Sequence, residues 1–385
     1  MFRLRPHKLV RPIIVADLGS NSAGVCLIEP GRPAAIISAE RLTLPWKERT
    51  PKERTAGVLS LLDEACAHAS ALLARMKAER HMLAPKEAYA IIHAHWTNSQ
   101  TSETAVLYEK EETVTEEMMS SLARKALEQT KEIDRSGIFE ASVTCIDLNG
   151  YTTGRPNGKR ARQVSIPTLM SSFEPGLAQG ARETLLRHFP GEVSFRSMTR
   201  AILAAVKESG GQIRNSIIID IGGETANCIV MRDGIIDSHV VAGKGAREIL
   251  MHIAGKGSAE EILSLMRMRE KDACSEPECA RLDSSLAEVE LELTKSFGET
   301  MARLANLRRL PNAMTIIALP ELLPWLVRFF SRIDFGQFTV TTQPFKPSAL
   351  SPDDLASFAV AASGVRVDTS LALAASFVNI ERLQD

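Results

Sequence analysis

The chain has 385 residues, 44% of them hydrophobic, and is therefore long enough to form more than one domain. Its 46 basic and 47 acidic residues nearly balance, which excludes bulk electrostatic attraction to nucleic acid. Among the six cysteines, Cys274 and Cys279 lack further Cys or His neighbours that would complete a zinc site. No secretory signal is visible and no apolar run approaches a membrane span, so we predict a cytoplasmic protein.

Residues 1–11 open the chain with four Arg or Lys side chains and no acid. Such a segment can contact an anionic membrane surface, or it can be a solvated tail. Pro6 argues against an amphipathic helix here.

The first predicted structural unit is a β-hairpin from Ile13 to Ile28. A strand without polar alternation ends in Asp17 and is followed by a turn of glycine and small polar residues. Backbone N–H groups in such a turn can point at one anion, and serine hydroxyls add further donors. Asp17, at the strand end, is placed to hold Mg²⁺ through its waters.

The next elements alternate between strand and helix. The sequence predicts a strand over 32–44, a helix over 50–82 that begins with Thr50-Pro51, and a strand over 88–95. Two histidines, His93 and His95, alternate on the last strand. A metal pair on one strand face is possible, but no third ligand is evident, which favours structural or surface histidines.

A block rich in strands follows before the next long helix. We predict strands at 104–112, 141–148, 161–170 and 192–195, and helices from Thr115 to about 131 and at 177–188. A turn-rich loop separates the second and third strands. An alanine-rich helix, 198–208, then leads to the second half of the chain.

The second half repeats the hairpin. Asp220, Gly222, Ala226 and Gly234 fall at the same offsets as Asp17, Gly19, Ala23 and Gly31 of the first copy. One such turn would be ordinary, but two registered copies, each opening a three-strand meander, favour a clamp that grips phosphates from both sides. Glu224 in the second turn is a candidate for positioning a water, and the alternative is a turn residue that faces solvent.

The remaining predicted elements are a strand over 235–241, helices from 246 to about 307, a strand over 315–319, a helix over 322–332 and an alanine-rich tail over 351–380. Two turns stand out among them. Gly243, Lys244 and Gly245 open the first helix, and Leu319-Pro320-Glu321 follow the strand.

The paired hairpins resemble the phosphate-1 and phosphate-2 motifs of the actin-like ATPase superfamily, and the resemblance covers nearly the whole chain. It implies an α/β fold of two ribonuclease-H-like lobes around a cleft for ATP and Mg²⁺. It assigns phosphate contacts to Gly19, Ser20, Asn21, Ser22, Gly222, Gly223, Glu224 and Thr225. It assigns the metal, through water, to Asp17 and Asp220. The ribose and adenine side would be Gly243, Lys244, Gly245, Arg247, Glu248, Leu319, Pro320 and Glu321.

The adenine turn departs from the family pattern. In the family this strand ends in two glycines that admit the purine, whereas here Leu319 and Pro320 stand in their place. A bulky and a rigid residue occupy space that the base approaches. The expected adenine pocket is therefore atypical.

The block at 90–198 resembles the inserted 1C subdomain of the division protein FtsA, also described as SHS2-like, and the pilus-assembly protein PilM carries a related insertion. The expected division of the chain follows the family. Lobe 1 core (1A) takes 1–89, 199–213 and 350–385, the insert (1C) takes 90–198, lobe 2 core (2A) takes 214–245 and 310–349, and the helical 2B subdomain takes 246–309.

Three functions are implied by these resemblances. The first is an FtsA-like scaffold that binds ATP, is at most a slow ATPase, associates with itself in a possible protofilament and recruits division proteins at the inner face of the cell membrane. The alternative is a PilM-like adaptor for the cytoplasmic tail of an inner-membrane pilus protein, favoured because no basic amphipathic terminal helix is visible. The third is a degenerate scaffold without nucleotide. Membrane association would be at most indirect.

Overall fold

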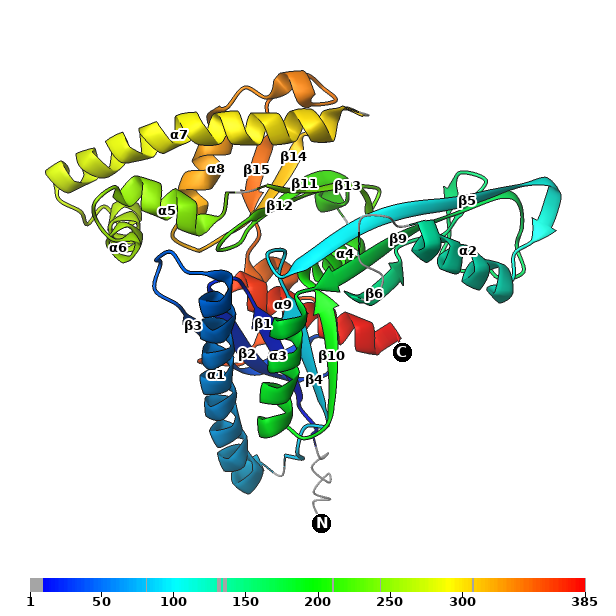
Figure 1. Ribbon diagram of the computed structural model, residues 1–385, viewed down its shortest axis with the longest axis horizontal. Helices are drawn as coiled ribbons and strands as arrows, with labels where there is room; N and C mark the ends of the chain where they lie inside the picture. The colour runs from blue at the N-terminus through cyan, green and yellow to red at the C-terminus, as the bar shows by residue number, and fades with distance from the viewer. Residues whose placement is uncertain are drawn as a thin grey trace, which may run out of the picture.

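A computed structural model describes residues 10–80, 82–129, 133, 137–209, 211–242, 244–306 and 308–384. The basic segment, apart from its last two residues, and Gly243 lie outside these ranges. The chain forms two lobes, one above the other in Figure 1, with an arm on one side and a helical projection on the other.

Lobe 1 is built on a six-stranded mixed sheet in the order β10-β4-β1-β2-β3-β16. Its strands are β1 (Ile13–Leu18), β2 (Ser22–Glu29), β3 (Ala34–Thr43), β4 (Glu87–Ile92), β10 (Glu192–Ser197) and β16 (Ala359–Ala361). β1 is buried along its whole length, which explains why its sequence shows no polar alternation. It pairs antiparallel with β2 and parallel with β4.

Lobe 2 repeats this arrangement in a five-stranded sheet of order β13-β12-β11-β14-β15. Its strands are β11 (Ser216–Ile221), β12 (Ala226–Arg232), β13 (Ile235–Ala242), β14 (Ala313–Ile317) and β15 (Lys346–Ala349). β11 pairs antiparallel with β12 and parallel with β14, as β1 does with β2 and β4. The repeated hairpin is therefore the start of a repeated sheet, and Asp17 and Asp220 end equivalent strands.

Helices cover both faces of both sheets. These helices are α1 (Pro51–Arg80), α3 (Pro175–His188), α4 (Met198–Ser209), α5 (Ala246–Ala254), α6 (Ala259–Glu270), α7 (Glu276–Ala305), α8 (Leu323–Arg332) and α9 (Thr369–Gln384), whereas α2 (Glu116–Gln129) belongs to the insert. Short 3-10 turns occur at Gly211–Asn215, Gly336–Phe338 and Pro352–Leu355. α1 and α3 bury the outer face of the lobe 1 sheet, and α5 to α8 bury the outer face of lobe 2. α4 and α9 lie between the sheets in a core that both lobes share.

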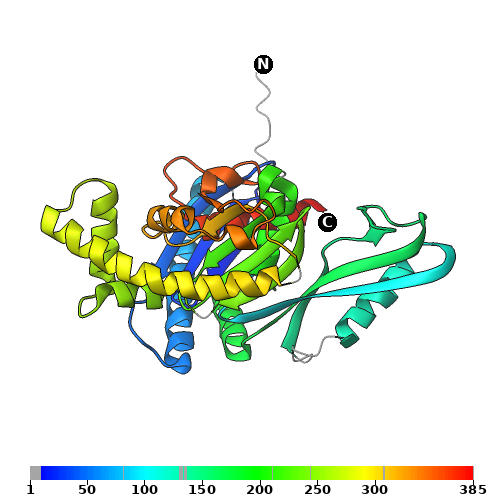
Figure 2. The ribbon, with the colours of Figure 1, turned by 90° about the horizontal axis from the view of Figure 1, so that it is seen from above.

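The insert is a separate small sheet that projects from lobe 1 as an arm (Figures 1 and 2). Its strands are β5 (Thr97–Thr113), β6 (Ile138–Val143), β7 (Asp147–Leu148), β8 (Tyr151–Thr152) and β9 (Arg160–Phe173), and α2 packs on one face. The expected range, 90–198, is longer than this sheet. β10 pairs with β4 and α3 packs on α1, so both belong to lobe 1, whose core their apolar residues complete.

Two further expectations concern helices. Among the described residues, α1 has one segment, Pro51–Lys77, long and apolar enough to cross a membrane, although the sequence suggested none. Its residues Val58, Leu62 and Leu73 are buried in the lobe 1 core, as in a core helix of a folded domain. Within the alanine-rich tail, the stretch before residue 362 contains strand β16, and only the later stretch forms a long helix, α9.

Candidate functional site between the lobes

The two hairpin turns meet at a small cavity between the lobes. Its volume is about 100 Å³. Lobe 1 lines it with Gly19, Ser20, Asn21, Ser22, Arg41, Thr43, Trp46, His93, Asp368, Thr369 and Ser370. Lobe 2 lines it with Asp220, Ile221, Gly222, Gly223, Ala246, Ile317, Ala318, Leu319 and Pro320. The fold thus brings together most of the residues that the resemblance assigned to phosphate and metal.

Asp17 is completely buried at the end of β1 and is bound by two cationic side chains. Arg41 Nη2 lies 2.5 Å from its Oδ2, and His93 Nε2 lies 2.7 Å from its Oδ1. Burial alone would raise the pKa of this carboxyl, but His93 and Arg41 lower it to about 2. Both oxygens of the predicted metal ligand are thus engaged by the protein itself.

His93 lies between the two predicted metal ligands. Its Nδ1 is 3.7 Å from Asp220 Oδ2 in lobe 2, while its Nε2 contacts Asp17 in lobe 1. Burial alone would lower the pKa of His93, but Asp17 and then Asp220 raise it to about 10. The imidazole is therefore a buried cation held by carboxylates of both lobes.

The sequence indicated His93 only as an alternating histidine, and it did not indicate Arg41. Arg41 lies in β3 and reaches Asp17 and Asp368 through its guanidinium nitrogens. Asp368 precedes α9, more than three hundred residues away in the chain. His93 follows β4, and the parallel pairing of β4 with β1, which no sequence pattern records, places it beside Asp17.

The two turns touch each other directly. The Glu224 backbone N–H donates to Ser20 Oγ across the lobes, at 3.0 Å. A Cβ on Gly223 would lie 2.6 Å from Ser20 Oγ, so a side chain at this position would displace the Ser20 hydroxyl from its contact with the second turn. The Gly19 and Gly222 N–H groups donate within their own turns, to the carbonyls of Ser22 and Thr225. No gap for a phosphate group separates the turns at this point of contact.

Glu224, the candidate for positioning a water, is held by two arginines. Arg247 Nε lies 2.7 Å from its Oε1, and Arg54 Nη2 from lobe 1 lies 3.2 Å from its Oε2. Burial would raise the pKa of Glu224, but Arg247 and Arg54 lower it. A carboxylate that is ionised and bound on both oxygens is a poor proton acceptor.

None of the described residues of the predicted ribose side lines the cavity. Lys244 forms ion pairs with Glu248 and with Glu292 of α7. Gly245 is the N-cap of α5, and a Cβ there would lie 2.4 Å from the backbone carbon of Glu224. This glycine allows α5 to pack against the second turn.

On the predicted adenine side, Leu319 and Pro320 line the cavity together with Trp46. Trp46 comes from the segment between β3 and α1 in lobe 1, but its ring is buried in the lobe 2 core. Its backbone N–H donates to Glu260 Oε1 of α6, at 2.9 Å. Glu321 faces Arg267, with 3.7 Å between Oε1 and Nε.

The residues of this site do not fit a magnesium nucleotide in the observed arrangement. Pockets for such ligands usually measure roughly 300–1,000 Å³, several times the observed cavity. The described residues contain no group of three or more His, Cys, Asp or Glu side chains that could hold a metal ion. Trp46 lines the predicted adenine side of the cavity, and His93 lies between the two predicted metal ligands.

Comparisons with known proteins gave matches by structure alone. No protein-family model and no curated protein sequence matches the chain. A solved structure titled PilM-PilN type IV pilus biogenesis complex matches with a TM-score of 0.62 and 10% identity, over 97% of this chain and 99% of that one. The ethanolamine utilization protein EutJ from Carboxydothermus hydrogenoformans matches with a TM-score of 0.44 and 13% identity, over 95% and 92%. The first match shares the fold over the whole chain.

Proposed function

The chain has the actin-like ATPase fold that its paired hairpins predicted, and on this premise we propose that it is a cytoplasmic adaptor, similar to PilM, that binds a short segment of an inner-membrane protein. The observation that carries the proposal is the cleft. Its cavity is small and the charged side chains at it are paired with one another, which favours protein binding over nucleotide turnover.

PilM supports this choice over a division scaffold. The matched solved structure is titled a PilM-PilN complex. The match covers 97% of this chain and 99% of the matched chain. The FtsA-like division role rests on the sequence resemblance of the insert. Self-association and recruitment of division proteins stay expectations of that resemblance.

We place the partner in a groove where the insert meets lobe 1. The groove measures about 110 Å³ and lies between the end of β6, α4 and α9. Leu203, Phe377 and Ile380 give it an apolar floor, and Lys207 and Glu381 give it charged edges. Among the described strands β6 pairs only with β9, so its other edge is available to an extended peptide.

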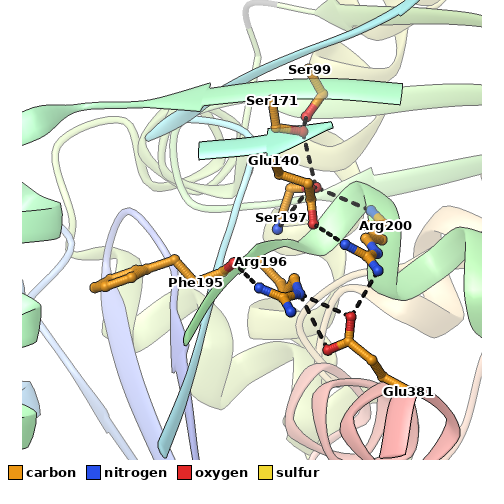
Figure 3. Close-up of polar contacts among 8 residues, drawn as sticks. All are labelled: Ser99, Glu140, Ser171, Phe195, Arg196, Ser197, Arg200 and Glu381. Carbon is orange, nitrogen blue, oxygen red and sulfur yellow. Dashed lines mark hydrogen bonds and ion pairs between the residues drawn. The ribbon is translucent and has the colours of Figure 1, made fainter. Parts of the chain in front are cut away.

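A buried polar network holds this groove in shape (Figure 3). Glu140 of β6 accepts from Ser197 Oγ at 2.5 Å and from Arg200 Nη1 at 3.2 Å. Arg200 Nη2 also donates to Glu381 of α9 at 2.7 Å, and Arg196 donates to the same carboxylate. One arginine therefore ties the insert, α4 and α9 together, which fixes the two walls of the groove.

The test is membrane fractionation with matched variants. We expect the protein to sediment with inner membranes in its native cells and to stay soluble when produced alone in an unrelated host. Val143→Arg, at the groove, should release it from the membranes. Leu291→Arg changes an equally apolar and more exposed residue on α7, 77% exposed against 38% for Val143, and should leave sedimentation unchanged.

A photo-reactive amino acid identifies the partner directly. Placed at position 143, it should crosslink to one membrane protein, whereas placed at position 291 it should not. Wild-type protein that stays soluble in its native cells, or a V143R variant that sediments like wild type, would contradict the adaptor proposal.

A further inference from the structure

We propose that the side chain of His93 takes the place of a divalent cation between Asp17 and Asp220, and that it closes the two lobes together with Trp46 and Arg54. These three residues, all from lobe 1 and all in contact with lobe 2, are called the internal latch below. The proposal goes beyond the adaptor function, because it concerns how the lobes are held and not what they bind.

The first step of the argument is position. Asp17 and Asp220 lie at the ends of equivalent strands of the two sheets, and His93 lies between them. His93 contacts the first at 2.7 Å and approaches the second at 3.7 Å. A cation bridging these carboxylates would have to displace the imidazole. The bridge between the lobes is therefore already made by the chain.

The second step is charge. Arg41 pairs with the carboxylates of Asp17 and Asp368, and the imidazole of His93 lies between those of Asp17 and Asp220. Removal of the histidine would leave the Asp17 and Asp220 carboxylates without the side chain that separates them. Carboxylate oxygens are the ligands that hard divalent cations prefer. In a variant without His93, a cation is therefore expected to take the place of the imidazole.

The third step is the rest of the interface. Arg54 of α1 forms an ion pair with Glu224 in the second turn, and both side chains are about one-tenth exposed. Trp46 is 9% exposed and packs in the core of lobe 2. The contacts of the latch extend from the metal position to the predicted base position. Lobe closure therefore requires no bound ligand.

The test measures Mn²⁺ binding to the full chain by electron paramagnetic resonance. We expect wild type to show no Mn²⁺ bound at this site. His93→Ala should bind one equivalent, with an affinity at least about tenfold higher than that of wild type, a difference of roughly 1.4 kcal/mol. Adding Asp220→Asn to His93→Ala should abolish that binding. His68→Ala is the matched control, because His68 is exposed and pairs with Glu40 instead of the aspartates.

Two results would overturn the proposal. One is a wild-type protein that binds one Mn²⁺, or Mg²⁺ with ATP, in a manner that Asp220→Asn abolishes. The other is a folded His93→Ala variant, with native circular dichroism, that gains no affinity for Mn²⁺. If His93→Ala does not fold, His93→Asn replaces it, since the amide keeps a donor towards Asp17 without the charge. Membrane sedimentation of the variants separates this outcome from failure of the adaptor proposal.

Discussion

Two glycines near the cleft permit contacts that any side chain would block. Gly245 is the sharper case, because the atoms near its missing Cβ are backbone atoms of the second turn and cannot rotate away. Gly223, in contrast, faces the Ser20 hydroxyl of the other lobe. The first glycine supports the packing inside lobe 2, and the second supports the contact between lobes.

Gly245→Ala should lower the free energy of unfolding by about 1–3 kcal/mol, because the added methyl group overpacks a site without free volume. Chemical denaturation measures the change. Gly154→Ala is the control, since a Cβ there has nothing within 4 Å. Equal stability of the Gly245→Ala variant and this control would show that the turn can move.

His239 predicts a dependence of stability on pH. Its Nδ1 faces the Ser99 carbonyl at 3.0 Å, so that β13 of lobe 2 is bound to β5 of the insert. Burial lowers the pKa of His239 below the ordinary value of 6.5, and the Ser99 carbonyl offsets this only in part. The unfolded chain therefore binds a proton at His239 more readily than the native protein does. As the pH falls through 6.5, protonation of His239 in the unfolded chain lowers the free energy of unfolding.

The measurement compares melting temperatures at pH of about 7.5 and about 5.5, on either side of the ordinary histidine pKa. Wild type should lose more stability on acidification than His239→Gln, because the variant lacks the titrating group. A variant with the same loss as wild type would place the effect elsewhere in the molecule.

At the scale of elements, the network around Glu140 determines how firmly the arm is attached. The Glu140 side chain is 1% exposed and receives donors from β10 and α4. We expect Glu140→Gln to weaken this junction by about 1–3 kcal/mol, because one buried donor loses its charged acceptor.

Amide hydrogen exchange, measured separately for each element, tests this prediction. Exchange should increase in β6 and in the first turn of α4 and stay unchanged in the lobe 2 sheet. Glu103→Gln is the control, because Glu103 binds Ser165 inside the arm at 2.5 Å and does not reach lobe 1. Increased exchange in the same segments of both variants would contradict a specific role of Glu140.

The elements themselves were largely predictable, because buried strands and registered turns leave clear patterns. The hairpins at Asp17 and Asp220 and the long helix after Thr50 follow directly from such patterns. The end of the insert was not predictable in this way. Whether β10 joins the arm or pairs with β4 depends on contacts between segments a hundred residues apart, which periodicity does not record.

The site shows the same division between local and long-range information. The sequence identified the residues of the two turns, which lie together at the cavity. It could not identify Arg41, Arg54 and Trp46, since an arginine or tryptophan near a strand end has no special pattern. Their roles arise only when the second lobe supplies Glu224 and the apolar core.

At the scale of the whole molecule, the internal latch predicts lobes that are closed without ligand. The radius of gyration from X-ray scattering should be the same with and without millimolar magnesium ATP. A compaction on addition of nucleotide would contradict a latch that closes the lobes alone.

Trp46→Ala should allow the lobes to separate, because it removes the ring that joins lobe 1 to the core of lobe 2. We expect a loss of about 3–5 kcal/mol in stability and a larger radius of gyration. Tyr151→Ala is the control, since this aromatic residue is 79% exposed on the arm. A destabilised but equally compact W46A protein would show that other contacts suffice for closure.

The threading of the chain through lobe 1 has a consequence for its synthesis. β16 completes the lobe 1 sheet beside β3, and Asn379 of α9 donates to the carbonyls of Gly31 and Phe358. The strands of lobe 2, in contrast, all lie between Ser216 and Ala349. Domains fold as units during translation, so the lobe that leaves the ribosome first is the last to be finished. Nascent lobe 1 must keep an apolar face open until some three hundred and fifty residues have followed β1.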